Sequence, residues 1–125
     1  MKYYQLFIDT DSAETFNSVT TLLGLQPTET KKDKMLDDQY SSWMYTVTES
    51  DTDPYFDFIN FFLDILEPNF AHLEKLGVTK DKILFWMCYG YDQQCAMEFH
   101  PQEMARLGQS GIHLNIDCWS LNTTT

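Results

Sequence analysis

Basic residues are scarce in this chain of 125 residues, which has 8 Lys and Arg against 19 Asp and Glu and a net charge of −11. Between Met35 and Glu74 the sequence holds nine acidic residues and no Lys or Arg. Contacts with nucleic-acid phosphates or anionic lipids need basic side chains, so this balance argues against nucleic acid and membranes as partners. An acidic surface instead favours a basic protein partner.

Signals for metal binding and for membrane insertion are lacking as well. The cysteines Cys88, Cys95 and Cys118 include no CxxC pair, and the three histidines stand far apart. We therefore expect reduced structural thiols, no metal site and no cofactor. The sequence leaves open whether Cys88 and Cys95 approach each other across a turn. With no apolar run of about 18 residues and no secretory pattern at the N-terminus, we expect a cytoplasmic protein.

Apolar residues make up 43% of the chain and aromatic residues 15%, which is ample for one hydrophobic core. Residue spacings predict a single α+β domain over residues 1–121, in the order β-α-β-α-β-β-α-β, with a frayed tail at residues 122–125. We expect a mixed five-stranded sheet with two main helices packed on one face, and parallel pairing across the early β-α-β crossover. The predicted strands cover residues 2–9, 42–49, 82–89, 94–100 and 113–119, with a turn beginning at Gly90.

Local signals place the helix boundaries. Asp11 is expected to cap the first helix, with Glu14 completing a capping box. Asp53, directly before a proline, is expected to cap the second helix. This second helix is predicted to run to Leu66, and Pro68 then ends or kinks it.

The second predicted helix carries the candidate binding site. Its acids share one stripe, and Phe58, Phe61 and Ile65 form an apolar strip beyond the arc that packing on one sheet face requires. Aromatic anchors beside acidic side chains are typical of a protein interface. The candidate partner-binding residues are Asp57, Phe58, Phe61, Asp64 and Glu67.

Two other arrangements account for the same apolar strip. The kinked segment after Pro68, or the polar loop over residues 28–41, would cover it as part of the core. A homodimer through Phe58 and Phe61 is the second arrangement, although it would bring two acidic stripes together.

Catalytic motifs are weak. Asp9-Thr10-Asp11, directly after an apolar strand, resembles the first motif of the haloacid-dehalogenase phosphatases. That fold needs a larger chain, a downstream Lys and a further acidic pair. The cysteine–histidine pairs lie five residues apart and would point to opposite faces of a strand. We therefore expect no enzymatic activity.

Several different short motifs are spread over nearly the full length of the chain. They are Leu23-Gly24-Leu25-Gln26-Pro27, Trp43, Leu63 to Pro68, Leu107-Gly108 and Leu114 to Trp119. Together they resemble a bacterial family known as domain of unknown function 4279, in which an aromatic residue other than Trp is usual at the last position. Small acidic domains of this kind resemble immunity proteins of contact-dependent inhibition and related polymorphic toxin systems. The resemblance implies an immunity-type protein. The acids of the second predicted helix and its flanking loops further predict that it neutralises a basic toxin domain, such as a nuclease, by occluding its active site. A self-associating structural or ligand-binding domain without enzymatic activity is the alternative.

Overall fold

The protein is built on one four-stranded sheet, seen in a computed structural model that describes residues 1–28, 42–49 and 55–122. The strands are β1 (Lys2–Asp9), β2 (Ser42–Glu49), β3 (Ile83–Tyr91) and β4 (His113–Ser120), in the spatial order β2-β1-β3-β4. β1 pairs antiparallel with β2 and β3, and β3 pairs parallel with β4. The expected α+β class and mixed sheet are therefore confirmed.

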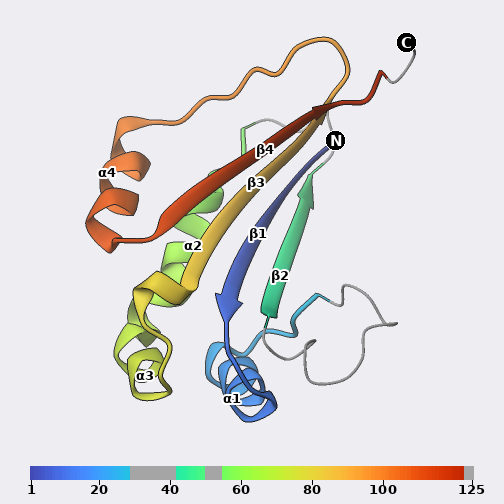
Figure 1. The fold of residues 1–125 in the computed structure, drawn as a ribbon. Coiled ribbons are helices and arrows are strands. Elements are labelled where there is room, and N and C mark those ends of the chain that lie inside the picture. The colour runs from blue at the N-terminus through green and yellow to red at the C-terminus, as the bar shows by residue number, and fades with distance from the viewer. Residues whose placement is uncertain (29–41, 50–54, 123–125) are drawn as a thin grey trace.

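The described helices lie behind this sheet and at its margins, as Figure 1 shows. They are α1 (Ala13–Leu23), α2 (Phe58–Leu66), α3 (Phe70–Lys75) and α4 (Pro101–Ser110), with 3-10 turns η2 (Glu67–Asn69) and η3 (Lys80–Lys82). α2 packs behind the sheet in Figure 1, α1 and α3 lie toward its lower end, and α4 lies beside β4.

The prediction of a fifth strand over residues 94–100 is wrong. In this segment Cys95, Met97 and Phe99 are half-buried and alternate with exposed residues, yet the segment forms no strand. β3, its predicted hairpin partner, already has β1 on one side and β4 on the other. Both edges of β3 are therefore occupied, and the alternation reflects burial of one side of an extended chain without ladder pairing.

The expected parallel pairing after the first helix is also wrong. β1 and β2 are antiparallel, with Tyr4 opposite Val47. α1 lies at the end of the sheet where β1 finishes, so the chain enters β2 from the same end (Figure 1). The crossover through α4 instead joins the parallel pair, β3 and β4.

The residues that cap the helices differ from those predicted. Ser12, one residue after the predicted Asp11, caps α1 by accepting a hydrogen bond from the Thr15 amide at 3.2 Å. Asp57 caps α2, because its carboxylate accepts from the Asn60 amide at 3.0 Å. The predicted cap at residue 53 lies outside the described residues. The break at Pro68 is confirmed, since η2 follows α2 directly there.

The core lies between the sheet and the inner face of α2. Its largest fully buried side chains include Trp43, Phe62 and Phe85, and the Phe62 and Phe85 ring centroids lie 5.2 Å apart. The Trp43 indole Nε1 donates to Thr20 Oγ1 at 2.9 Å, which ties β2 to α1. With its inner face committed to this core, α2 has only its outer face to offer to a partner.

Gly90 belongs to β3, where the sequence predicts a turn. A Cβ added at this position would lie 2.9 Å from ring atoms of Trp119 on β4. The glycine therefore allows the indole to lie close against the neighbouring strand, and it has no role in chain reversal.

Candidate functional site

The five predicted partner-binding residues lie at different depths. Phe58 is only 2% exposed and stacks on Tyr4 with ring centroids 4.6 Å apart. It also lies edge-on to Phe99 at 6.4 Å. Phe58 is therefore a core residue in this structure, and the predicted apolar strip narrows at the surface to Phe61 and the half-buried Ile65.

The other four residues form what we call the α2 outer surface: Asp57, Phe61, Asp64 and Glu67. Phe61 is 39% exposed, and its ring lies 5.7 Å from that of Phe56. The Asp64 side chain, three residues on, is 70% exposed. The helix thus presents an accessible aromatic side chain next to an accessible carboxylate, as the spacing predicts.

Arg106 from α4 binds this surface and is the only arginine in the chain. Its guanidinium donates to Asn60 Oδ1 at 2.7 Å, to Asp64 Oδ1 at 2.9 Å and to Glu67 Oε1 at 2.7 Å. These hydrogen bonds hold the pKa of the Glu67 carboxyl below its usual range and raise the pKa of Arg106. Two carboxylates share one cation here, so the cluster keeps one net negative charge.

Sequence reasoning missed Arg106 because no local pattern relates it to α2. α2 and α4 are far apart in the sequence, with a separation of 42 residues between Asp64 and Arg106, and only the folded structure brings them together. Within the sequence, the one available signal is that a lone arginine stands in a strongly acidic chain, where it has many potential carboxylate partners.

A buried carboxylate lies at the start of α4. Glu103 is 2% exposed, and its Oε1 accepts a hydrogen bond from the Tyr55 hydroxyl, while its Oε2 has no partner among the described residues. Burial and the bond to Glu103 raise the pKa of Tyr55. The ring of His100 stacks on Tyr55 at 4.5 Å, and its Nε2 lies 2.7 Å from Glu98 Oε2, which raises the pKa of His100.

Tyr55 also lines a cavity of about 240 Å³ between β1, β3 and the segment before α4. Its lining residues are Lys2, Tyr4, Tyr55, Phe56, Met87, Ala96, Met97 and Glu98. The hydroxyl of the lining residue Tyr4 donates a hydrogen bond to Glu49 Oε1 at 2.8 Å. Two tyrosine–glutamate hydrogen bonds therefore help to order the walls of this cavity.

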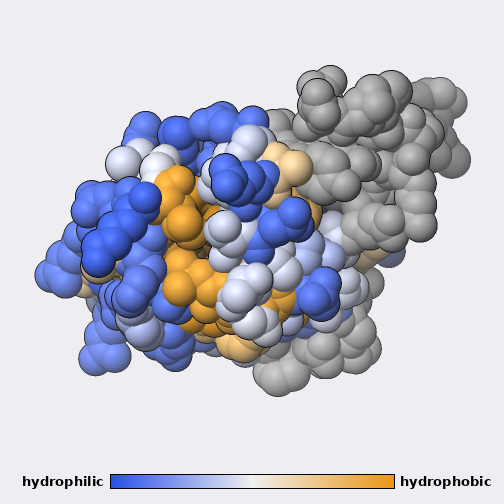
Figure 2. Space-filling model, turned by 90° about the horizontal axis from the view of Figure 1, so that it is seen from below, coloured by the Kyte–Doolittle hydropathy of each residue, from blue (hydrophilic) through white to orange (hydrophobic). Residues whose placement is uncertain are grey.

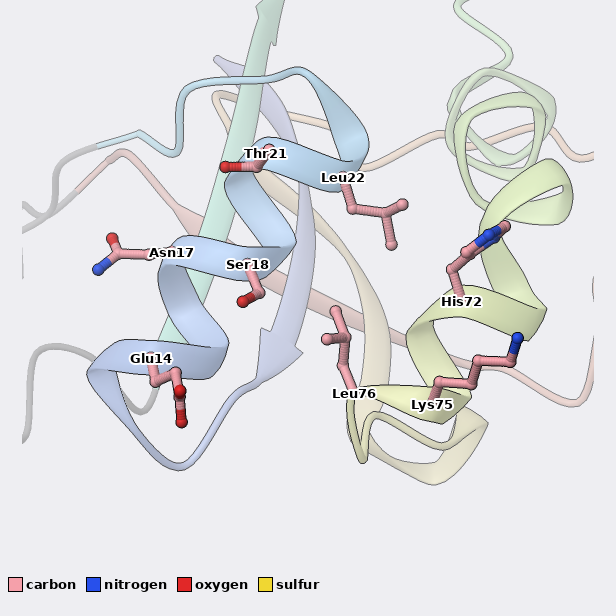
Figure 3. A pocket seen from close by; sticks show the side chains of 8 residues that line it. All are labelled: Glu14, Asn17, Ser18, Thr21, Leu22, His72, Lys75 and Leu76. Carbon is pink, nitrogen blue, oxygen red and sulfur yellow. The ribbon is translucent and has the colours of Figure 1, made fainter.

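A larger groove, of about 610 Å³, separates α1 from α3. Seen from that end of the molecule, an apolar stretch lies between hydrophilic regions (Figure 2). Leu22 and Leu76 extend into the groove from the two helices, with Glu14 on the α1 side and Lys75 on the α3 side (Figure 3). Its rim therefore carries both signs of charge, unlike the α2 outer surface.

In the phosphatase-like motif, Asp11 forms an ion pair with Lys82 of η3. Asp11 Oδ2 lies 2.9 Å from Lys82 Nζ, and this hydrogen bond lowers the pKa of Asp11. Partial burial is the main cause of the raised pKa of Asp9. Within residues 1–28, 42–49 and 55–122 there is no cluster of three His, Cys, Asp or Glu side chains that could hold a metal ion.

Comparison with known proteins identifies the family. Residues 3–121 match the model of a domain of unknown function, DUF4279, so the chain belongs to this family. No curated protein and no solved structure matches the chain. No helix in the described part of the chain is long and apolar enough to cross a membrane.

Proposed function

We propose that this chain is a small acidic binding protein of the immunity type, without enzymatic activity, which neutralises a basic toxin domain such as a nuclease. The observation that carries the proposal is the pairing of Phe61, 39% exposed, with Asp64, whose side chain is 70% exposed, on the outer face of α2. The net charge of −11 supports attraction to a cationic partner over a long range.

The two kinds of side chain would contribute differently to binding. Phe61 would supply buried contact area at the centre of the interface, where aromatic anchors contribute most of the affinity. Asp57, Asp64 and Glu67 would steer a basic surface toward the site and mimic phosphates in its substrate groove. Phe58 would not contact the partner, because it lies on the inner side of α2 and packs in the core.

Arg106 sets the orientation of the acids before any partner arrives. Its hydrogen bonds hold Asp64 and Glu67 in one geometry, which lowers the entropy lost on binding. A cationic side chain of the partner would then join or displace the guanidinium. The groove between α1 and α3 is the weaker candidate for a basic partner, because Lys75 stands on its rim.

Self-association is the second candidate function. It is favoured by the sheet face that points away from α2. Among the residues that the structure describes, no helix lies in front of that face (Figure 1). From the strand registers, half-buried side chains of one face include Tyr3, Phe7, Leu84, Trp86 and Trp119. Such an aromatic surface suits a symmetric dimer.

The test is capture of the partner from the native host with the tagged protein, release by a salt ramp and identification by mass spectrometry. The captured protein is then purified and titrated against wild type, Phe61→Asp, Asp64→Lys and the matched control Asp92→Lys, which makes the same charge change in the turn after β3. We expect a basic domain whose activity the wild type inhibits. Phe61→Asp should weaken binding at least about 30-fold, and Asp64→Lys should slow association, while the control binds almost normally.

Equal binding by wild type, Phe61→Asp and Asp64→Lys would remove the α2 outer surface from the proposal. A protein that captures only its own copies, and sediments as a dimer, would favour self-association. In that case Trp86→Asp, on the exposed sheet face, should yield the monomer.

A further inference from the structure

Two of the three cysteines lie within reach of each other. Cys95 Sγ and Cys118 Sγ are 3.1 Å apart, and both residues are free thiols, Cys95 half-buried and Cys118 exposed. A disulfide bond is about 2.05 Å long, so bond formation requires the sulfurs to approach by only about 1 Å. Rotation of the two side chains can supply such a movement.

The fold explains why this pair meets and the pair left open by the sequence does not. Cys118 is the register partner of Tyr89, whereas Cys88 is the register partner of Asp117. Successive residues of a strand point to opposite faces, so Cys88 and Cys118 lie on opposite faces of the sheet. Cys88 is buried beside its register partner Tyr3, and the segment carrying Cys95 passes over the other face.

We propose that Cys95 and Cys118 form a reversible disulfide by exchange with a low-molecular-weight disulfide, fixing the segment before α4 to β4. One cysteine thiolate attacks a sulfur of the small disulfide, forming a mixed disulfide and releasing one small thiol. The second cysteine loses its proton, attacks the mixed disulfide at the protein sulfur and releases the other small thiol. Two protein thiols are oxidised and one small disulfide is reduced to two thiols.

The segment held by this bond has few other backbone restraints. Residues 92–100 form no strand, and Met97 and Phe99 attach the segment through side-chain packing on the core. Ala96, Met97 and Glu98 form one wall of the cavity of about 240 Å³ beside Tyr55. Oxidation would therefore fix this wall, and reduction would release it.

The protonation of the pair sets the speed of the exchange. The hydrogen bond from Cys95 is the main cause that raises the pKa of Cys118 to about 11. Since the thiolate is the attacking form, ring closure should be slow near pH 7 and should become faster as the pH rises toward 9.

The experiment is oxidation of the reduced protein with oxidised glutathione at pH 8, followed by alkylation, intact mass measurement and peptide mapping. Wild type and Cys88→Ser should each lose the mass of two hydrogen atoms before alkylation and take up two fewer alkyl groups than their reduced forms. Each should yield one crosslinked peptide pair containing residues 95 and 118. Cys95→Ser and Cys118→Ser should stop at the mixed disulfide or at the free thiol. The oxidised wild type should melt roughly 5–10 °C higher than its reduced form.

Hydrogen exchange provides the second readout. Amides of residues 92–100 should exchange more slowly in oxidised than in reduced wild type, with no such difference for Cys118→Ser. Persistent mixed disulfides in the wild type, or crosslinks that involve Cys88 or a second molecule, would overturn the proposal. Unchanged exchange in this segment after ring closure would overturn its structural part.

Discussion

Two polar contacts hold α4 against the region of α2, and they differ in burial. Near the start of α4, the carboxylate of Glu103 is 2% exposed and accepts a hydrogen bond from Tyr55. Further along the helix, Arg106 joins Asp64 and Glu67, whose side chains are 70% and 43% exposed. In the first contact the carboxylate lies away from water, although Tyr55 itself is 41% exposed, while the second contact competes with water on both sides.

Because of this difference in burial, the Tyr55–Glu103 contact should act mainly on stability, and the Arg106 contacts should act mainly on recognition of a partner. A buried carboxylate without a hydrogen-bond donor destabilises the fold by its full desolvation penalty, because no protein group replaces the lost water. The Tyr55 contact therefore helps to decide whether α4 packs in its observed position. An exposed ion pair contributes little to folding, but it determines which charges the surface presents to a partner. The two contacts should therefore respond differently to mutation, to salt and to pH.

Removal of the donor to the buried Glu103 carboxylate should have the largest effect. Tyr55→Phe leaves the Glu103 carboxylate without its hydrogen-bond donor, so we expect the free energy of unfolding to fall by about 1–3 kcal/mol. Urea unfolding followed by circular dichroism measures this loss. The matched control is Tyr45→Phe, a half-buried tyrosine whose hydroxyl bonds to none of the described residues, which should change stability by less than about 0.5 kcal/mol. Equal losses in the two variants would contradict the role assigned to the buried contact.

Removal of the exposed cation should have a smaller effect on stability. Arg106→Ala breaks the hydrogen bonds to Asp64 and Glu67, and we expect a loss below about 1 kcal/mol, since all three side chains are at least 28% exposed. Part of this loss should disappear in about 1 M salt, where exposed charges are screened. Arg106→Lys is the control, because it keeps the charge but loses the two-pronged geometry. A loss in Arg106→Ala as large as that in Tyr55→Phe would show that burial does not distinguish the two contacts.

Local sequence patterns predict the elements of this fold well. Alternation and apolar runs place all four strands to within two residues of their observed bounds. The signal is clearest in β1 and β3, where every second residue is buried along most of the strand. Pro68 likewise marks the end of α2, since it lacks the backbone donor that a continuing helix needs. Both signals depend on neighbouring residues in the chain, which is why the sequence carries them.

Non-local contacts account for the errors. Residues 94–100 have the pattern of a strand, but pairing depends on a free edge, and β4 occupies the edge of β3. Phe58 and Phe61 lie on the same predicted strip, and only the packing of Tyr4 and Phe99 against Phe58 makes it a core residue. Arg106 approaches Asp64 from 42 residues away. None of these contacts has a signature at the level of local spacing.

The smallest effect we predict is on the pH dependence of stability. Arg106 lowers the pKa of Glu67 from its ordinary value of 4.5 in the folded protein. A lowered folded-state pKa contributes stability that is present above pH 4.5 and is lost as the pH falls through the folded pKa. Urea midpoints of wild type and Arg106→Ala should therefore converge as the pH falls from about 5 to 3.

Glu67→Gln provides the control for this convergence, because it removes the titrating group and leaves the helix intact. Its difference from the double variant Glu67→Gln/Arg106→Ala should vary less with pH over the same range than the difference between wild type and Arg106→Ala. A constant gap between wild type and Arg106→Ala would mean that the guanidinium acts through packing of its stem alone. Arg106 would then be a structural residue of α4, and the carboxylates of Asp64 and Glu67 would be equally available to a partner with or without it.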